Sequence, residues 1–227
     1  LNKILETKNV DYVIASDTDS VYITFDGLVN KVFKEGTDVN TVVNFLDKVA
    51  KEKLEPHIST SYQALAKVTN AYEQKMEMGR EAIADKGIWT AKKRYILNLY
   101  DMEGVRYKEP KLKIMGLESV KSSTPAPCRE KLKEAIKIIM GGDEEMLNTF
   151  IQDFREEFMT LPPEDIAYPR SCNGVNKFRG TDRLFMKGAP IHVKGAILYN
   201  HLVEKNKLNN KYPYIQEGDK VKFIHMQ

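Results

Sequence analysis

The chain has 227 residues, of which 42% are hydrophobic and 30% charged, and its formal net charge is +3. This length allows one large domain or two small ones with a real core, and the composition is that of ordinary globular proteins. No stretch approaches the roughly 20 consecutive apolar residues that span a bilayer, which excludes a transmembrane helix. The first residues, Leu1-Asn2-Lys3-Ile4, contain neither an initiator methionine nor a signal peptide, so we expect the natural protein to start further upstream.

Cysteine and histidine usage indicates a reduced, intracellular protein, and we expect it in the cytoplasm. Cys128 and Cys172 form neither a disulfide framework nor a zinc-ligand spacing. The histidines are scattered, and we expect them to be structural or surface residues rather than metal ligands. They are His57, His192, His201 and His225.

The first third of the chain predicts a β-hairpin followed by two helices. Residues 11–16 and 20–25 are rich in β-branched and aromatic residues, and the polar triplet Asp17-Thr18-Asp19 lies between them. Apolar side chains recur at helical spacing over 38–54. Pro56 follows where a second helix could begin.

The middle of the chain predicts an antiparallel sheet, with Met102-Glu103-Gly104 as one of its turns. Strands are expected at 75–84, 88–100 and 105–107, and a further extended segment at 112–117.

Helical patterns dominate the remainder. The run Ser122-Ser123-Thr124-Pro125 is typical of a capped helix start. Helices are expected at 129–140, 144–159 and 195–205, a loop-rich stretch at 164–195, and two final strands, the last at 221–226. The predicted fold class is therefore α+β: an antiparallel sheet with an acidic hairpin packed on helices, then a mostly helical part.

The acidic hairpin carries the strongest chemical signal. Residues i and i+2 of an extended chain share a face, so Asp17 and Asp19 are expected to direct two carboxylates at one point. Mg²⁺ takes one or two protein carboxylates together with substrate phosphates. Two ions about 3.5–4 Å apart can activate a 3′-hydroxyl and stabilise a departing pyrophosphate. An Asp-x-Asp triplet is also an ordinary turn, but the apolar strands on both sides favour a metal site.

A basic run, Lys92-Lys93-Arg94-Tyr95, is the second signal. If it lies in a strand, Lys93 and Tyr95 share one face, and a cation beside an aromatic hydroxyl suits contact with a nucleic-acid backbone. The alternative interpretation is an exposed basic edge strand that resists aggregation.

Several segments resemble the family B DNA polymerases of T-even phages. Residues 17–22 resemble the third palm motif, Tyr-Gly-Asp-Thr-Asp-Ser, although Ala15 and Ser16 replace its first two residues; the T-even branch also tolerates alanine at the first place. Lys93 and Tyr95 resemble the Lys-x-Tyr motif of these enzymes. Residues 109–125 are very similar to the segment that joins palm to thumb, and 190–200 to part of the thumb. The resemblance runs in order from about Asp11 to Lys222.

This resemblance implies that residues 1–121 are the C-terminal half of a polymerase palm and 122–227 an incomplete thumb. It implies that Asp17 and Asp19 are catalytic and metal-binding, with two Mg²⁺ ions in the complete enzyme. Asp19 would bridge both ions together with an upstream aspartate, and Asp17 would be an outer ligand or a partner of Lys93. The residues implied to contact DNA are Lys92, Lys93, Arg94, Tyr95, Gly116, Lys121, Ser122, Ser123 and Thr124.

The implied function is template-directed nucleotidyl transfer in a host-cell cytoplasm. The upstream aspartate motif and the fingers lysine of these enzymes are missing, so we expect no polymerisation by this chain alone. The implied partners are primer-template DNA, deoxynucleoside triphosphates, the missing N-terminal part of the polymerase and a sliding clamp, with no membrane.

Two other functions fit part of the pattern. One is a haloacid-dehalogenase-type phosphatase with Asp17 as nucleophile and Asp19 as general acid. The other is a non-catalytic DNA-binding module. A strand directly after the acids argues against the phosphatase, and the intact Asp-x-Asp argues against the module.

Overall fold

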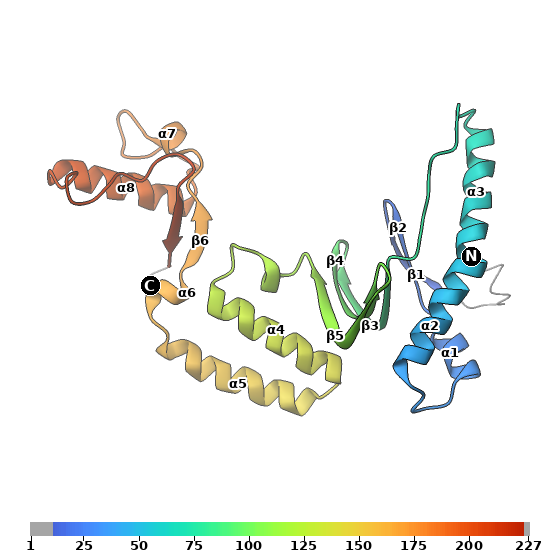
Figure 1. The fold of residues 1–227 in the computed structure, drawn as a ribbon. Helices are drawn as coiled ribbons and strands as arrows, with labels where there is room; N and C mark the ends of the chain where they lie inside the picture. Colours follow the sequence, from blue (N-terminus) through green and yellow to red (C-terminus); the bar gives the residue numbers. More distant parts are fainter. Residues whose placement is uncertain (1–10, 225–227) are drawn as a thin grey trace. The chain divides into compact units, whose positions relative to one another are not determined.

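Two compact units make up the chain, Leu1–Met115 and Gly116–Gln227, in a computed structural model that describes residues 11–224 (Figure 1). The first unit combines a hairpin, helices and a three-stranded antiparallel sheet, and the second is mostly helical. The predicted α+β class is confirmed.

The predicted acidic hairpin is confirmed. Strand β1 (Val13–Asp17) pairs antiparallel with β2 (Ser20–Ile23), and Asp17 lies opposite Ser20. Thr18 and Asp19 form the two-residue turn, in which Thr18 adopts the left-handed conformation with φ of 48°. A positive φ at the first turn residue matches the twist of two-residue hairpins.

A nearly continuous helical rod follows (Figure 1). After α1 (Asp26–Val32), the helices α2 (Val39–Val49) and α3 (Glu55–Val68) are joined without a break by a π-helical segment, Ala50–Leu54. The two helices were predicted, but α1 and the π-helical junction were not. The proline at the start of α3 lacks an N–H, and it is tolerated because the first helical positions need no intrahelical donor.

The sheet of the first unit is an antiparallel meander in the order β3 (Ala82–Ala91), β4 (Arg94–Met102), β5 (Val105–Met115). Three predicted boundaries were wrong. Residues 75–81 are not in a strand, and 88–100 is divided by a turn at 92–93. Residues 105–107 and 112–115 belong to one strand, which ends before 116–117. The turn escaped prediction because it contains no Gly, Asn or Pro and is flanked by strong β formers.

The sheet is tied to α2 by a largely buried ion-pair network. Arg80, just before β3, donates from Nε to Asp47 of α2 at 2.9 Å and from Nη1 to Asp101 of β4. Arg106 of β5 donates to Asp101 at 3.2 Å and to Asn44 of α2 at 3.0 Å. These contacts fix the sheet against α2.

The second unit begins with a 3₁₀ turn, Glu118–Val120, and continues with a helical hairpin, α4 (Ala126–Gly141) and α5 (Glu144–Thr160). Gly142, with φ of 77°, ends α4, and Asp143 caps α5 by accepting a hydrogen bond from the backbone N–H of Met146 at 2.8 Å. The predicted helix break is thus confirmed. The predicted hydroxyl cap of α4 was wrong: Pro125 is the N-cap, and no side chain in the described range caps this helix.

The rest of the second unit packs around α8 (Ile191–Lys205), which starts before the predicted residue 195. The loop-rich stretch contains α6 (Pro163–Ile166), α7 (Val175–Phe178) and an unpredicted strand β6 (Tyr168–Ser171), which pairs with β7 (Lys220–Phe223). Residues 225–226 of the predicted last strand, with His225, lie outside the described residues. The core of this unit comprises Cys172, Val175, Val193, Ala196 and Ile197.

Across the described residues, every helix is too short or too polar to cross a bilayer.

Candidate active site and DNA-contact residues

The acidic turn presents two carboxylates in different environments. Asp17, the last residue of β1, is half-buried, and its Oδ1 accepts a hydrogen bond from Thr18 Oγ1 at 3.2 Å. Asp19 is exposed at the second turn position. The hydroxyl of Ser20 donates to the backbone carbonyl of Asp17 at 3.1 Å, which closes the turn. Because Asp19 lies in the turn, strand alternation does not set its direction, and that part of the sequence argument was wrong.

The oxygen donors of the turn fit a hard divalent cation that brings further ligands. Within residues 11–224, no group of three or more His, Cys, Asp or Glu side chains gathers closely enough to hold a metal by itself. Mg²⁺, however, commonly takes only one or two protein carboxylates and completes its shell with water and phosphate oxygens. Asp17 and Asp19 are donors of this kind.

Aromatic side chains connect the hairpin with the sheet. The ring of Tyr22 in β2 lies 5.4 Å from that of Trp89 in β3 and 5.4 Å from that of Tyr95 in β4. Burial, followed by the hydrogen bond with Tyr22, raises the pKa of Tyr95, and the negative charges of Glu81 and Asp17 act in the same direction.

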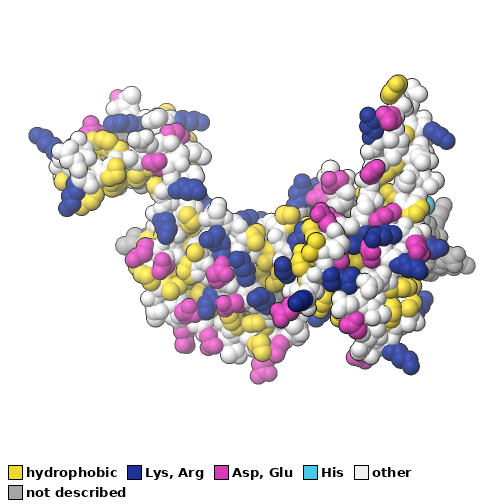
Figure 2. Space-filling model, in the orientation of Figure 1, with side chains coloured by type: hydrophobic (Ala, Val, Ile, Leu, Met, Phe, Trp, Pro, Cys, Tyr) yellow, Lys and Arg dark blue, Asp and Glu magenta, His cyan; other side chains and the backbone are white. Residues whose placement is uncertain are grey.

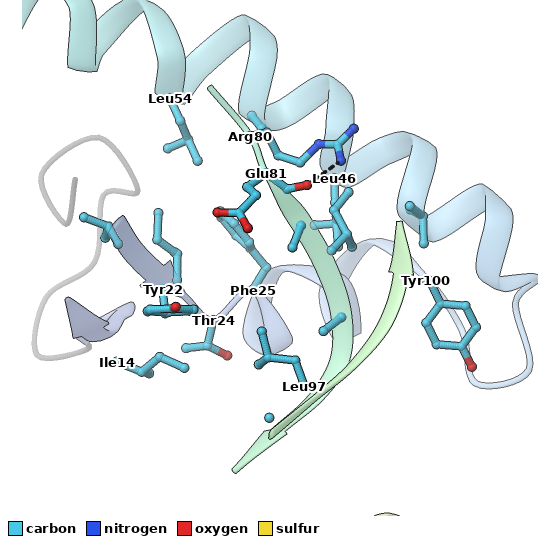
Figure 3. A pocket seen from close by; sticks show the side chains of 18 of the residues that line it. Ile14, Tyr22, Thr24, Phe25, Leu46, Leu54, Arg80, Glu81, Leu97 and Tyr100 are labelled. Atoms are coloured by element: carbon cyan, nitrogen blue, oxygen red, sulfur yellow. Dashed lines mark hydrogen bonds between the residues drawn. The ribbon is translucent and has the colours of Figure 1, made fainter. Parts of the chain in front are cut away.

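A cavity of about 580 Å³ lies between the hairpin, the helical rod and the sheet of the first unit (Figure 3). Asp19 lines it, whereas Asp17 is not among its described lining residues. Lys113 of β5 and Glu81 also line it and form an ion pair at 2.6 Å. Most other lining side chains are apolar, and Figure 3 shows Tyr22, Phe25 and Leu97 among them.

Lys92 and Lys93 form the tight turn between β3 and β4, and both are exposed. The sequence suggested that Lys93 and Tyr95 share one face of a continuous strand. This was wrong, because Lys93 lies in the turn and adopts the left-handed conformation with φ of 61°. Arg94 is exposed at the first position of β4, opposite Ala91. Lys92, Lys93 and Arg94 are therefore neighbours at an exposed hairpin tip.

The remaining predicted DNA-contact residues lie at the start of the second unit. Gly116 has φ of 71°, a backbone conformation that favours glycine whether or not DNA approaches. Lys121 forms an ion pair with Glu118 at 2.9 Å. The hydroxyl residues are in the turn before α4: Ser122, Ser123 and Thr124. Figure 2 shows basic and acidic side chains interspersed on the visible face of each unit.

Sequence reasoning missed the residues that surround the predicted site. Trp89 is the single tryptophan of the chain, and Tyr22 is the last residue of the 17–22 segment, to which no role was assigned. Neither signal specifies a contact, since the three aromatic residues come from separate strands. The Lys113–Glu81 pair was missed for the same reason.

Comparison with known proteins finds similarity to two DNA-directed DNA polymerases. The chain is similar to the DNA-directed DNA polymerase of Enterobacteria phage T4, with 39% identity over 215 residues, covering 89% of this chain and 24% of that protein. It is also similar to the DNA-directed DNA polymerase of Escherichia phage RB69, with 40% identity over 230 residues, covering 97% of this chain and 25% of that protein. No family model matches the chain.

These similarities confirm the predicted relationship to the family B DNA polymerases of T-even phages. The chain spans about a quarter of the length of these relatives.

Proposed function

We propose that this chain supplies part of the polymerase site of a T-even-type DNA-directed DNA polymerase. Asp19 and Asp17 bind divalent metal, and the β3–β4 tip binds the primer-template backbone. The observation that carries the proposal is the contact between Tyr22, three residues after Asp19, and Tyr95, two residues after Lys93. It brings the acidic and basic motifs of the sequence together within one unit.

The roles of the two carboxylates follow from their exposure. Asp19 is exposed and lines the cavity, so it is the principal metal ligand, whereas half-buried Asp17 is the outer one. Two Mg²⁺ ions, when bound, supply the charge stabilisation that nucleotidyl transfer to a 3′-hydroxyl requires. The second carboxylate motif and the triphosphate-binding lysine lie outside this chain, so it binds DNA and metal but does not extend a primer by itself.

The remaining assignments are part of the same proposal. We assign residues 1–121 to a palm and 122–227 to a thumb, and the division into compact units after Met115 supports an assignment close to this boundary. Lys121, Ser122, Ser123 and Thr124 bind the phosphate backbone where the chain passes from one part to the other. The partners are primer-template DNA, deoxynucleoside triphosphates, the rest of the polymerase and a sliding clamp.

The phosphatase alternative is not favoured. Strand β2 begins at Ser20, directly after Asp19, whereas a phosphatase of that class needs a loop there. The sheets of the described residues are antiparallel, which does not fit the alternating strand–helix order of that fold.

Binding of a primer-template duplex, measured with and without Mg²⁺ at constant ionic strength, tests the proposal. We expect Mg²⁺ to raise the DNA affinity of the chain and Asp19→Asn to abolish this effect, because the amide removes the charge with little change of shape. The matched control is Asp153→Asn, at an exposed position of α5. An Mg²⁺ effect that survives Asp19→Asn would contradict the metal assignment and favour the non-catalytic DNA-binding module.

Primer extension gives a second test. We expect no extension by the purified chain. Extension that disappears in Asp19→Asn would show that the chain alone holds a complete site, against the proposal.

A further inference from the structure

We infer that Tyr22 and Trp89 are positioning residues that fix the acidic turn relative to the Tyr95 strand, so that metal binding and DNA binding depend on each other. This inference deepens the proposed function and rests on it. Neither residue is among the predicted metal-binding or DNA-contact residues, although Tyr22 is the last residue of the 17–22 segment. Both act through residues of the acidic and basic motifs: Tyr22 acts through the acidic turn, and Trp89 acts through Tyr95.

Backbone pairing does not hold the hairpin on the sheet. Among the described strands, β1 and β2 form a two-stranded sheet of their own, and β3, β4 and β5 form another. An isolated two-stranded hairpin is marginally stable in water. Side-chain packing therefore sets the position of the acidic turn relative to the basic tip, the β3–β4 turn with Lys92, Lys93 and Arg94.

The packing consists of three rings. Tyr22 meets Trp89 edge to face, with ring centroids 5.4 Å apart and planes at 73°, and meets Tyr95 at 5.4 Å and 59°. Trp89 and Tyr95 are direct cross-strand partners of β3 and β4, with centroids 6.3 Å apart. The three distances, and the edge-to-face angle of Tyr22 and Trp89, are those that aromatic pairs prefer. Each ring contacts the other two, so the cluster fixes both the distance and the orientation of β2.

Gly87 makes room for the indole. A Cβ placed on Gly87 would lie 2.6 Å from Trp89 Cζ3 and 2.7 Å from Cη2. The two residues share one face of β3, being two positions apart, and the ring covers the bare glycine. Trp89 Nε1 is buried without a hydrogen-bond partner in the described structure. The indole thus contributes its shape and aromatic surface here, and a phenyl ring offers part of the same surface.

The cluster also brings the charge of the acidic turn to Tyr95. The Tyr95 hydroxyl is hydrogen-bonded with Tyr22, and the charge of Asp17 acts on it. A cation on Asp17 and Asp19 reduces that negative charge, and DNA at the basic tip contacts the strand that carries Tyr95. Two ligands that act on one rigid cluster influence each other's affinity equally.

Fluorescence tests the packing without any ligand, because Trp89 is the single tryptophan. We expect Tyr22→Ala to shift the Trp89 emission to longer wavelength and to increase its quenching by acrylamide, since the ring loses a partner that covers it. Tyr22→Phe keeps the ring and should leave the emission close to that of the wild type. The control is Tyr72→Ala, at a fully exposed tyrosine of the same unit. Unchanged emission in Tyr22→Ala would overturn the cluster.

Linkage between Mg²⁺ and DNA tests the positioning role. We expect Trp89→Ala to reduce the Mg²⁺-induced gain in primer-template affinity by at least about 5-fold, the lower end of typical coupling. Its affinity without Mg²⁺ should remain within about 2-fold of the wild type, because the basic tip stays exposed. Trp89→Phe should restore most of the gain, which separates positioning from general loss of structure.

The outcomes separate this inference from the proposed function. An equal Mg²⁺ gain in the wild type and in Trp89→Ala would overturn the coupling and leave the proposed function standing. No Mg²⁺ gain in the wild type would overturn the proposed function together with the coupling, whereas the emission shift in Tyr22→Ala would still establish the packing.

Discussion

Arg80 and Asp101 form an ion pair in the interior of the first unit, with 11% and 2% of their side chains exposed. Asp101 also accepts hydrogen bonds from Arg106 Nε at 3.2 Å and from the backbone N–H of Gly104 at 3.0 Å. A buried carboxylate is tolerated when its charge is paired and its oxygens are hydrogen-bonded. Here both conditions hold, so the pair orients β4 against the segment that precedes β3.

Asp101→Asn should lower the free energy of unfolding of the first unit by about 1.5–3 kcal/mol, because it removes one of the two counter-charges of the buried Arg80 guanidinium, which keeps its ion pair with Asp47. Urea unfolding followed by Trp89 fluorescence measures this unit, which contains the single tryptophan. The control is Glu77→Gln at an exposed position, expected to change stability by no more than about 0.5 kcal/mol. Equal midpoints for the two variants would contradict the structural role of the pair.

Acid should destabilise the first unit through the same carboxylate. Burial tends to raise the pKa of Asp101, but hydrogen bonds from Arg80, Arg106 and the Gly104 N–H outweigh it, and the pKa lies below its usual value. A lowered pKa in the folded state gives stability that is present above the unfolded-state pKa, about 3.9, and is lost as the pH falls through the folded value. We therefore expect urea midpoints to fall as the pH drops below about 4.

Asp101→Asn should reduce the fall of the urea midpoint with decreasing pH. Part of this fall should remain in the variant, because Asp47 contributes to it as well. The hydrogen bond from Lys51 and the contacts with Arg80 lower the pKa of Asp47 against the opposing effect of its burial. Urea midpoints between pH 3 and pH 6 measure the difference. Parallel curves for the wild type and Asp101→Asn would show that Asp101 does not carry the effect.

Gly87→Ala should disturb the aromatic cluster without altering any ring. The new methyl group would overlap the Trp89 indole, which must move, and overpacking of this kind typically costs about 1–3 kcal/mol. We expect a changed Trp89 emission and a lower urea midpoint. Gly104→Ala is a poor control because Gly104 has φ of 85°, so the matched variant is Gly195→Ala in α8, where a Cβ meets nothing within 4 Å.

Lys93→Ala should weaken primer-template binding and reduce the slope of log affinity against log salt by about 1, as expected for the loss of one phosphate contact. Binding measured over a range of salt concentrations gives both numbers. Lys34→Ala is matched as an exposed lysine between two elements of the same unit. If Lys34→Ala reduces the slope as much as Lys93→Ala, the basic tip is not the DNA contact.

The two thiols should react with alkylating reagents at different rates. Cys172 is fully buried in the core of the second unit, and burial raises the pKa of its thiol, with Asp219 and Glu217 acting in the same direction. Cys128 in α4 is only half-buried, although burial raises its pKa as well. We expect iodoacetamide to modify Cys128 first and Cys172 only as the second unit unfolds, which mass spectrometry of peptides can follow. Equal rates under native conditions would contradict this packing.

Local sequence signals were sufficient wherever the physics is local. The acidic hairpin was predictable because a polar triplet separates two runs of β formers, and turn and strand preferences act over a few residues. The helix break at Gly142 and Asp143 was predictable because glycine favours the left-handed conformation that ends a helix and aspartate caps the next one. The turn at Lys92 and Lys93 was not, since neither residue carries a turn preference.

The sequence by itself predicted the two motifs to which we assign the chemistry: Asp17 and Asp19 in one, and Lys93 and Tyr95 in the other. Only the tertiary structure decided that these motifs meet. The contact is made by Tyr22 of β2 with Tyr95 of β4, which lie in different strands and are far apart in the sequence. Pairing across such separations depends on how the helix and sheet pack, and the packing free energy is a property of the whole unit rather than of any segment.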